Sequence, residues 1–285
     1  MKILISDKMS NKVEDVLKSK QIDYDIKTGM SPEELKEVID QYDGILIRSA
    51  TKLTSDILAD CKNLKVIGRA GVGVDNVDLD QATKNKILVM NTPLGNLEAT
   101  AELSVGLMFS LMRNIHLAND STHQGKWEKP KFIGTELKGK TLGIVGYGNI
   151  GQRVAEICST IGMNIITNSK SASDEDLSRY KAKKVSTEQL IREADIISIH
   201  TKLNDETKYM FNKETLSIMK PTSVIINCAR GGLINEVDLK DALNNEVIAG
   251  AAIDVYENEP ATDNVMFGTK NLLLTPHLGL SLIHI

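Results

Sequence analysis

Residues 141–151 have the sequence TLGIVGYGNIG. The apolar run before Gly146 has the pattern of a buried strand, and residues 149–161 have the pattern of a helix. In this context Gly146 permits a tight turn, Gly148 lets the backbone approach a pyrophosphate, and Gly151 lets the helix pack on the strand. The N–H groups and the positive end of the helix then face the phosphates. This stretch therefore predicts a dinucleotide-binding α/β domain.

The rest of the chain continues the alternation of strand and helix patterns. Strands are expected at residues 3–6, 44–47, 66–68 and 87–90, and then at residues 142–145, 164–167, 196–200, 224–227, 249–254 and 272–275. Residues 31–34, SPEE, form a capping box with proline at the first helical position, which predicts a helix over Glu34–Ile39. Such alternation indicates parallel sheets, and the later group of strands fits a doubly wound nucleotide-binding sheet.

A chain of 285 residues is long enough for two domains, each with its own buried core. We expect a substrate domain at residues 1–97, a dinucleotide-binding domain at residues 98–279 and a short tail at residues 280–285. From Glu98 to Asn119, apolar residues recur at helical spacing. This segment is a helix that links the domains or an amphipathic core helix, and a linking helix must also bury one face.

The composition is that of an ordinary soluble protein, with 41% hydrophobic and 25% charged residues. A net charge of −4 without a basic cluster gives no reason to expect nucleic acid as a partner. No apolar run approaches the ~20 residues of a membrane span, and the N-terminal run is too short for a signal peptide. Cys61, Cys158 and Cys228 are far apart and odd in number, which favours a reducing compartment. We expect a cytoplasmic protein with no membrane partner and no metal.

The strand at residues 164–167 does not end in the acidic residue that usually binds the adenosine ribose. Asn168, Ser169 and Lys170 follow it instead. Two interpretations stay open. Ser169 and Lys170 contact the 2′-phosphate of NADP, or Lys170 is solvated and Ser169 alone holds the ribose. The expected cofactor is NAD, with NADP possible.

Three side chains later in the chain carry acid–base chemistry. When a hydride leaves a secondary alcohol, a base must take the hydroxyl proton, and His277 is the candidate because a neutral imidazole titrates near working pH. Glu259 would hold the imidazole and raise its pKa, and Arg230 offers a fork of donors for a carboxylate or carbonyl oxygen. Taken singly, each has an ordinary alternative as a structural or solvated residue. All three at the carboxyl ends of strands in one sheet indicate a dehydrogenase.

The chain resembles the D-isomer-specific 2-hydroxyacid dehydrogenases from about residue 40 to residue 279. The resemblance is carried by residues 67–76 (IGRAGVGVDN), 90–93 (MNTP), 134–141 (GTELKGKT), 146–151 (GYGNIG), 227–232 (NCARGG), 254–260 (DVYENEP) and 275–277 (TPH). It implies two Rossmann- or flavodoxin-like parallel-sheet domains, with the cofactor domain inserted in the substrate domain. It also implies that Arg230, Glu259 and His277 form the catalytic triad.

The resemblance implies further binding residues. The cofactor would lie along Gly146, Gly148, Asn149, Ile150, Gly151, Ser169, Lys170, Thr201, Cys228, Ala229 and Asp254. Within this set, Asn149 and Ile150 would sit on the pyrophosphate and Asp254 would hold the nicotinamide carboxamide. The substrate carboxylate would meet the backbone of Val72 and Gly73. Arg48 and Arg69 would favour a phosphorylated or doubly acidic substrate, although each could instead be a solvated cap of a strand.

The expected reaction moves a hydride between a nicotinamide cofactor and a D-2-hydroxy acid. The favoured substrate is 3-phosphoglycerate, which gives 3-phosphohydroxypyruvate at the entry to serine synthesis. One alternative is a glyoxylate or hydroxypyruvate reductase, and another is a non-catalytic protein that senses dinucleotides. A homodimer is expected from the resemblance and from the segment Glu98–Trp127.

Three positions depart from the family pattern. Ser169 replaces the ribose-binding acid, and Lys202 replaces a proline of the adenine-side loop. The family continues beyond the catalytic histidine with a helix that returns to the substrate domain, whereas residues 280–285 here are LSLIHI. We expect these six residues to be a cloning or assembly artefact.

Overall fold

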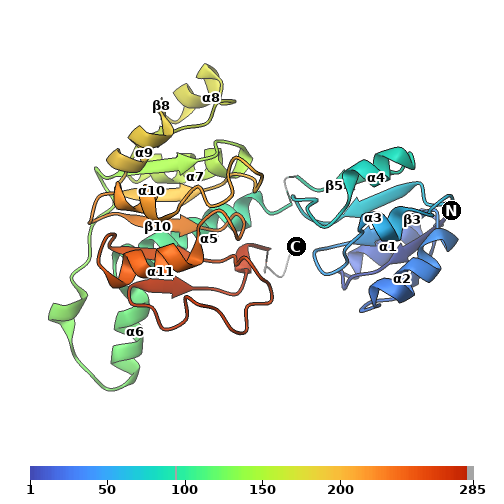
Figure 1. The fold of residues 1–285 in the computed structure, drawn as a ribbon, viewed down its shortest axis with the longest axis horizontal. Coiled ribbons are helices and arrows are strands. Elements are labelled where there is room, and N and C mark those ends of the chain that lie inside the picture. Colours follow the sequence, from blue (N-terminus) through green and yellow to red (C-terminus); the bar gives the residue numbers. More distant parts are fainter. Residues whose placement is uncertain (94, 281–285) are drawn as a thin grey trace. The chain divides into compact units, whose positions relative to one another are not determined.

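The computed structural model describes residues 1–93 and 95–280, so the expected tail lies outside the described residues from position 281 onward. The chain forms two compact units, Met1–Asn96 and a second that begins at Leu97 (Figure 1). Each unit is an α/β fold around one parallel sheet. The expected fold class of two parallel-sheet domains is therefore confirmed. None of the helices in the described part of the chain is long and apolar enough to cross a membrane.

The first unit has a five-stranded sheet in the order β2-β1-β3-β4-β5. Its strands are β1 (Lys2–Ile5), β2 (Asp23–Ile26), β3 (Gly44–Ile47), β4 (Val66–Arg69) and β5 (Leu88–Asn91), and its helices are α1 (Lys12–Ser19), α2 (Pro32–Val38), α3 (Ser55–Leu58) and α4 (Leu79–Lys84). The apolar strands form a buried core that includes Leu4, Ile45 and Ile67. The winding of the chain reverses between β1 and β3, and ligands of such sheets bind at the carboxyl ends beside that reversal.

Two details of this unit differ from the expectation. Strand β2 was missed because its sequence, DYDI, is half acidic and stays partly exposed at the sheet edge. The capping box is confirmed, since Ser31 Oγ accepts from Glu34 N at 3.2 Å and Glu34 Oε2 accepts from Ser31 N at 2.8 Å. Helix α2 nevertheless begins at Pro32 rather than Glu34, and a 3-10 turn, η1 (Ile39–Gln41), follows it.

The second unit has a seven-stranded parallel sheet in the order β12-β11-β10-β9-β6-β7-β8. Its strands are β6 (Thr141–Val145), β7 (Asn164–Thr167), β8 (Lys183–Lys184), β9 (Ile196–Ile199), β10 (Val224–Asn227), β11 (Gly250–Ile253) and β12 (Leu272–Leu274). Every strand expected here is present, with ends shifted by one residue at some positions. Strand β8 was missed because two exposed lysines give no apolar signal. The winding reverses between β6 and β9, which places a binding edge at their carboxyl ends.

Helices cover both faces of this sheet (Figure 1). They are α5 (Leu97–Met112), α6 (Ile115–His123), α7 (Asn149–Thr160), α8 (Asp174–Arg179), α9 (Thr187–Glu193), α10 (Lys213–Ser217) and α11 (Glu236–Asn244), with 3-10 turns η2 (Lys129–Phe132) and η3 (Leu278–Leu280). The apolar segment after Glu98 is not one helix, because Asn114 is left-handed at φ 53° and separates α5 from α6. Helix α5 is a core helix, with Ala101 and Met108 fully buried in the same cluster as α7.

Candidate active site

The glycine loop after β6 has two kinds of glycine. A Cβ at Gly146, where φ is 92°, would lie 2.6 Å from the carbonyl oxygen of His200, and a Cβ at Gly151 would lie 2.2 Å from the oxygen of Gly146. The chain itself therefore requires glycine at both positions. At Gly148, nothing lies within 4 Å of an added Cβ. That open space beside a strand-to-helix turn is where a pyrophosphate would lie, so the loop fits a dinucleotide.

Helix α7 supplies the donors for this space. It begins at Asn149, and its N-cap residue Gly148 provides no side-chain hydrogen bond. The N–H groups of Asn149 and Ile150 belong to the first turn, where a helix has no internal acceptors. These groups and the helix dipole together favour an anion at the N-terminus.

The ribose corner lies at the end of β7. The buried Thr167 donates to Ile144 O at 2.8 Å and accepts from Ser169 N at 3.3 Å, which fixes the start of the loop. Lys184, on β8, donates from Nζ to Lys170 O at 3.1 Å. A second cation therefore stands beside Lys170, and sequence reasoning missed it because β8 was not recognised.

The other cofactor candidates follow neighbouring strands at the same edge of the sheet. Thr201 lies just beyond β9, Cys228 and Ala229 follow β10, and Asp254 follows β11. Burial raises the pKa of Cys228 to about 12, so its thiol stays protonated at neutral pH. Cys228 is thus able to line a binding surface but is not a nucleophile.

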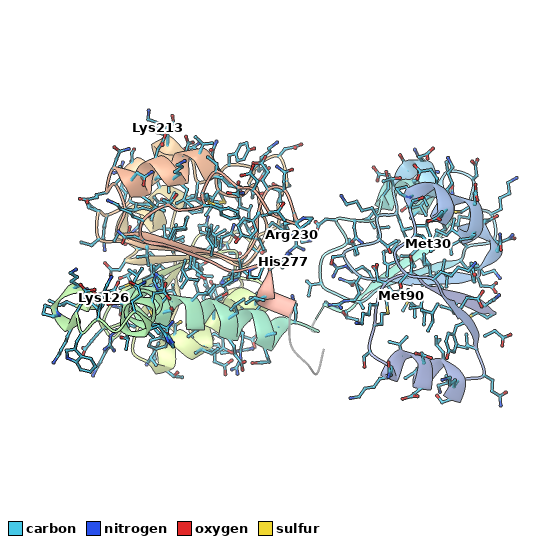
Figure 2. All side chains as sticks on the ribbon, turned by 90° about the horizontal axis from the view of Figure 1, so that it is seen from below. Met30, Met90, Lys126, Lys213, Arg230 and His277 are labelled. Atoms are coloured by element: carbon cyan, nitrogen blue, oxygen red, sulfur yellow. The ribbon has the colours of Figure 1, made fainter. Side chains whose placement is uncertain are left out.

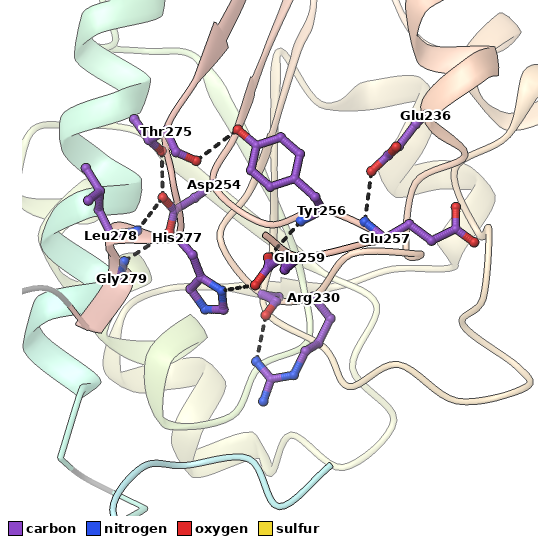
Figure 3. A network of polar contacts seen from close by, with 11 residues as sticks. Arg230, Glu236, Asp254, Tyr256, Glu257, Glu259, Thr275, His277, Leu278 and Gly279 are labelled. Atoms are coloured by element: carbon purple, nitrogen blue, oxygen red, sulfur yellow. Dashed lines mark hydrogen bonds and ion pairs between the residues drawn. The ribbon is translucent and has the colours of Figure 1, made fainter. Parts of the chain in front are cut away.

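Asp254 fastens the loop that carries the histidine (Figure 3). Its side chain is fully buried, and Oδ1 accepts from Thr275 Oγ1 at 2.6 Å and from Leu278 N at 2.7 Å. Its other oxygen, Oδ2, accepts from Gly279 N at 3.0 Å. Together, the two carboxylate oxygens therefore hold the residues before and after His277 in place.

His277 and Glu259 form a direct pair, with 2.7 Å between Nδ1 and Oε2. Glu259 Oε1 also accepts from Tyr256 N at 3.0 Å. The hydrogen bond and charge of Glu259 raise the pKa of His277 above its ordinary value, although burial opposes the shift. Burial alone would raise the pKa of Glu259, but the bonds from His277 and Tyr256 outweigh it and the pKa is lowered. The pair therefore favours a carboxylate beside an imidazole that readily accepts a proton.

The imidazole is positioned for a partner outside the pair. His277 lies in the left-handed region at φ 54°, a conformation that often occurs at functional sites in residues other than glycine. Its side chain is 41% exposed, and within the described residues Nε2 makes no hydrogen bond. This nitrogen is available to a bound substrate.

Arg230 lies in the same region as His277 and Glu259 (Figures 2 and 3). Its Nη1 donates to Ala229 O at 2.7 Å, and its own carbonyl accepts from Asn227 Nδ2 at 2.8 Å. The turn continues through Gly231, where a Cβ would lie 1.9 Å from Tyr256 O. The backbone beside Arg230 is thus pressed against the loop that leads to Glu259.

Two residues that sequence reasoning did not assign a role hold this site together. Asn227 is 2% exposed, and its Oδ1 accepts from Ala229 N at 3.0 Å. Tyr256 OH donates to Thr275 O at 3.0 Å, which joins the glutamate loop to the histidine loop. An asparagine at the end of the apolar run VIIN was the available signal for the first. No sequence signal identifies the second.

The substrate candidates share the first unit, whereas the candidate triad lies in the second. Arg48 follows β3, Arg69 is the last residue of β4, and Val72 and Gly73 lie in the next loop. Arg69 is 8% exposed, and its Nη1 would lie 1.3 Å from a Cβ at Gly71, so glycine is needed for the guanidinium to take this place. All four candidates therefore gather at the carboxyl edge of one sheet. The described residues include no cluster of side chains suited to a metal ion.

Comparison with known proteins assigns both parts of the chain to one family. The model of the D-isomer specific 2-hydroxyacid dehydrogenase catalytic domain matches residues 3–182, and that of the NAD-binding domain matches residues 105–279. A D-3-phosphoglycerate dehydrogenase of Synechocystis sp. is 43% identical over 280 residues, which are 98% of this chain and 50% of that protein. One of Bacillus subtilis is 42% identical over 286 residues, 98% of this chain and 53% of that protein. The chain thus spans about half the length of these relatives.

Solved structures show the same fold. A glyoxylate reductase from Paecilomyes thermophila aligns with TM-score 0.89 and 31% identity, covering 98% of this chain and 88% of that chain. A D-lactate dehydrogenase from Aquifex aeolicus, complexed with NAD and lactic acid, aligns with TM-score 0.86 and 27% identity, covering 97% of this chain and 88% of that chain.

Proposed function

Because this chain belongs to the D-isomer specific 2-hydroxyacid dehydrogenase family, we propose that it transfers a hydride between a nicotinamide dinucleotide and a D-2-hydroxy acid. The observation that carries this proposal is the 2.7 Å contact between His277 Nδ1 and Glu259 Oε2. The pair lies at the edge of the sheet that also holds the open space over Gly148. A proton acceptor and a place for the cofactor are the two parts that the reaction needs.

The residues of the chain accept and return the proton of the reaction. The dinucleotide, when bound, accepts or supplies the hydride. In the oxidative direction, the C–H bond of the substrate breaks with its electron pair while His277 Nε2 takes the hydroxyl proton, and a C=O bond forms. Glu259 stabilises the resulting imidazolium through Nδ1. In the reductive direction the imidazolium returns the proton to the carbonyl oxygen.

Arg230 would bind and orient the substrate, and Asp254 would orient the nicotinamide. The planar guanidinium of Arg230 suits the carboxylate or carbonyl oxygen of a 2-oxo acid. Asp254 already accepts three hydrogen bonds, and a carboxylate has about four acceptor sites. We propose that the remaining site accepts from the nicotinamide carboxamide, which requires the fully buried carboxylate to become accessible when the cofactor binds.

We propose 3-phosphoglycerate as the substrate. The names of the relatives support this choice, and so do Arg48 and Arg69, which supply two cations at one sheet edge. The substrate carboxylate would bind the backbone of Val72 and Gly73. A second candidate is glyoxylate or hydroxypyruvate reduction with NADPH, which is favoured by Lys184 beside Lys170 at the ribose corner.

We further propose that the protein is a cytoplasmic homodimer. The segment after α5 exposes large apolar side chains, among them Ile115, Trp127 and Ile133, with Trp127 88% exposed. A hollow of about 310 Å³ lined by Phe109 and Ile161 lies in the same unit. Lys126, beside Trp127, lies at the opposite end of the unit from His277 (Figure 2). Light scattering tests the dimer.

The three free cysteines, all buried, support the cytoplasmic location, because unpaired cysteines suit a reducing compartment.

Initial rates test the reaction and the substrate together. Reduction of 3-phosphohydroxypyruvate, glyoxylate and hydroxypyruvate is measured with NADH and with NADPH. We expect the highest kcat/KM with the phosphorylated substrate and NADH. Preference for an unphosphorylated substrate with NADPH would replace the first candidate by the second. NADH binding without turnover of any 2-oxo acid would indicate a dinucleotide sensor and would overturn the proposed chemistry.

A further inference from the structure

A buried acid stands at the point where the winding of the first unit reverses. Asp7 is the second residue after β1 and is 7% exposed. Strands β1 and β3 are neighbours in the sheet, and Arg48 directly follows β3. The crevice between such strands is the usual ligand position in an open α/β sheet. Asp7 therefore lies where the first unit is expected to receive its ligand.

Both carboxylate oxygens of Asp7 bind the turn formed by residues 48–51. Oδ2 accepts from the backbone N–H of Arg48 and, at 3.2 Å, from that of Thr51. Oδ1 accepts from Thr51 Oγ1 at 2.9 Å, and Ser6 Oγ lies 3.0 Å from the same hydroxyl. The side chain of Asp7 thus fixes the positions of the N–H groups at both ends of the turn.

Asn76 holds the carbonyl groups of the same two residues. Its Nδ2 donates to Arg48 O and to Thr51 O, each at 2.7 Å. The ends of the turn are therefore fully bonded. At its tip, Ser49 and Ala50 are exposed, and their N–H groups donate to no described residue. The turn thus has two N–H groups without a described acceptor next to Arg48, an arrangement suited to an anion.

The charge of Asp7 opposes the binding of an anion. Among the described residues, Asp7 takes part in no ion pair, so its carboxylate is a net negative charge beside the expected anion site. Like charges repel at this range. An acid here weakens anion binding by its charge alone, and its contribution must come from the hydrogen bonds that it accepts.

We propose that Asp7 is a positioning residue for substrate binding. Its carboxylate fixes the turn at residues 48–51 so that Arg48 and the N–H groups of the tip meet the phosphate group of the substrate. This inference rests on the proposed phosphorylated substrate. Asn76 holds the same turn from the other side through the turn's carbonyl groups. Because Asn76 lies in the loop that also contains Val72 and Gly73, it joins the two substrate loops.

The test compares two isosteric substitutions. Asp7→Asn removes the charge and leaves the side chain with one oxygen acceptor in place of two. Asp40→Asn is the matched control, because Asp40 also accepts from backbone N–H groups, those of Lys62 and Asn63 at 2.7 Å each and that of Leu64 at 3.4 Å. Asp40 precedes β3 and therefore lies at the other end of the sheet. Each variant is assayed for reduction of 3-phosphohydroxypyruvate and of hydroxypyruvate at saturating NADH, and for hydrogen exchange of residues 46–53.

We expect Asp7→Asn to raise KM for 3-phosphohydroxypyruvate about 10- to 100-fold, since hydrogen bonds to a charged group are lost. The value of kcat and the KM for hydroxypyruvate should change much less, and exchange of residues 46–53 should quicken. Asp40→Asn should leave both KM values near those of the wild type. If Asp7→Asn fails to fold, Thr51→Val, which removes one donor to Asp7 and keeps the charge, is expected to shift KM in the same direction.

Two results separate this inference from the proposed substrate. A wild type that does not prefer the phosphorylated substrate overturns the substrate and, with it, the phosphate role of the turn. A wild type that prefers it, with an unchanged or lowered KM in Asp7→Asn, overturns the role of Asp7 alone. A lowered KM would show that the repulsive charge of Asp7, rather than its hydrogen bonds, dominates.

Discussion

Alanine at two glycines of the loop after β6 should have opposite consequences. At Gly148 the backbone has φ −79° and ψ −165°, which alanine adopts, and nothing lies within 4 Å of the added Cβ. We expect Gly148→Ala to keep the stability of the wild type, or to gain about 0.4–1 kcal/mol because its unfolded chain is less flexible. The Cβ would occupy the space of the pyrophosphate, at a cost of about 1–3 kcal/mol, or about 5- to 150-fold in the Kd for NADH.

Gly151→Ala is the matched contrast. Its Cβ would lie 2.2 Å from the carbonyl oxygen of Gly146, so α7 has to move away from β6. Overpacking of this kind costs about 1–3 kcal/mol, and each kcal/mol lowers Tm by about 2–4 °C in a chain of this size. Differential scanning calorimetry gives the Tm, and isothermal titration calorimetry with NADH gives the Kd.

Either of two results would contradict these roles of the glycines. If Gly148→Ala binds NADH as the wild type does, the open space is not the phosphate site. If the Tm of Gly148→Ala falls as far as that of Gly151→Ala, the chain needs glycine at both positions for its own packing.

Three further substitutions probe the site. Glu259→Gln removes the group that raises the pKa of His277, so that pKa should fall; the decline of the reductive rate with rising pH, and the rise of the oxidative rate, should both move to lower pH, and unmoved pH–rate profiles would contradict the pairing. Gly71→Ala places a Cβ 1.3 Å from Arg69 Nη1, and it should raise substrate KM about tenfold or more by displacing the guanidinium while calorimetry shows an unchanged Kd for NADH. Asp254→Asn keeps one oxygen for Thr275 and Leu278 and leaves the buried N–H of Gly279 without an acceptor, which costs about 1–3 kcal/mol. Steady-state kcat should fall at least about tenfold, and a wild-type kcat would show that the loop holds without the carboxylate.

The elements that the sequence predicted are those whose burial produces a local pattern of apolar residues. Apolar runs such as VIIN at β10 are buried on both faces, so their signal is continuous and their position was found. Strands β2 and β8 lie at sheet edges and contain acids or lysines, so no apolar pattern marks them. The break at Asn114 also escaped prediction, because a left-handed residue between two helical patterns leaves their spacing almost unchanged.

The site divides in a similar way. Residues with reactive groups, such as His277 and Arg230, are recognisable because their chemistry limits where they occur, and their roles stay predictions. Residues that shape loops are not recognisable, since Asp7 and Tyr256 act through hydrogen bonds to backbone groups far along the chain. Such bonds depend on which strands become neighbours, and that is a property of topology rather than of any short motif.

One of the two edges of the seven-stranded sheet has a consequence for behaviour at high concentration. A strand at a sheet edge offers unpaired N–H and C=O groups on which a strand of another molecule can assemble. Here that edge is β8, which is two residues long and consists of the exposed Lys183 and Lys184. Its short length leaves little backbone to copy, and two such molecules would bring like charges together. At this edge, resistance to aggregation in a crowded solution therefore depends on two lysines, one of which also stands beside Lys170 at the ribose corner.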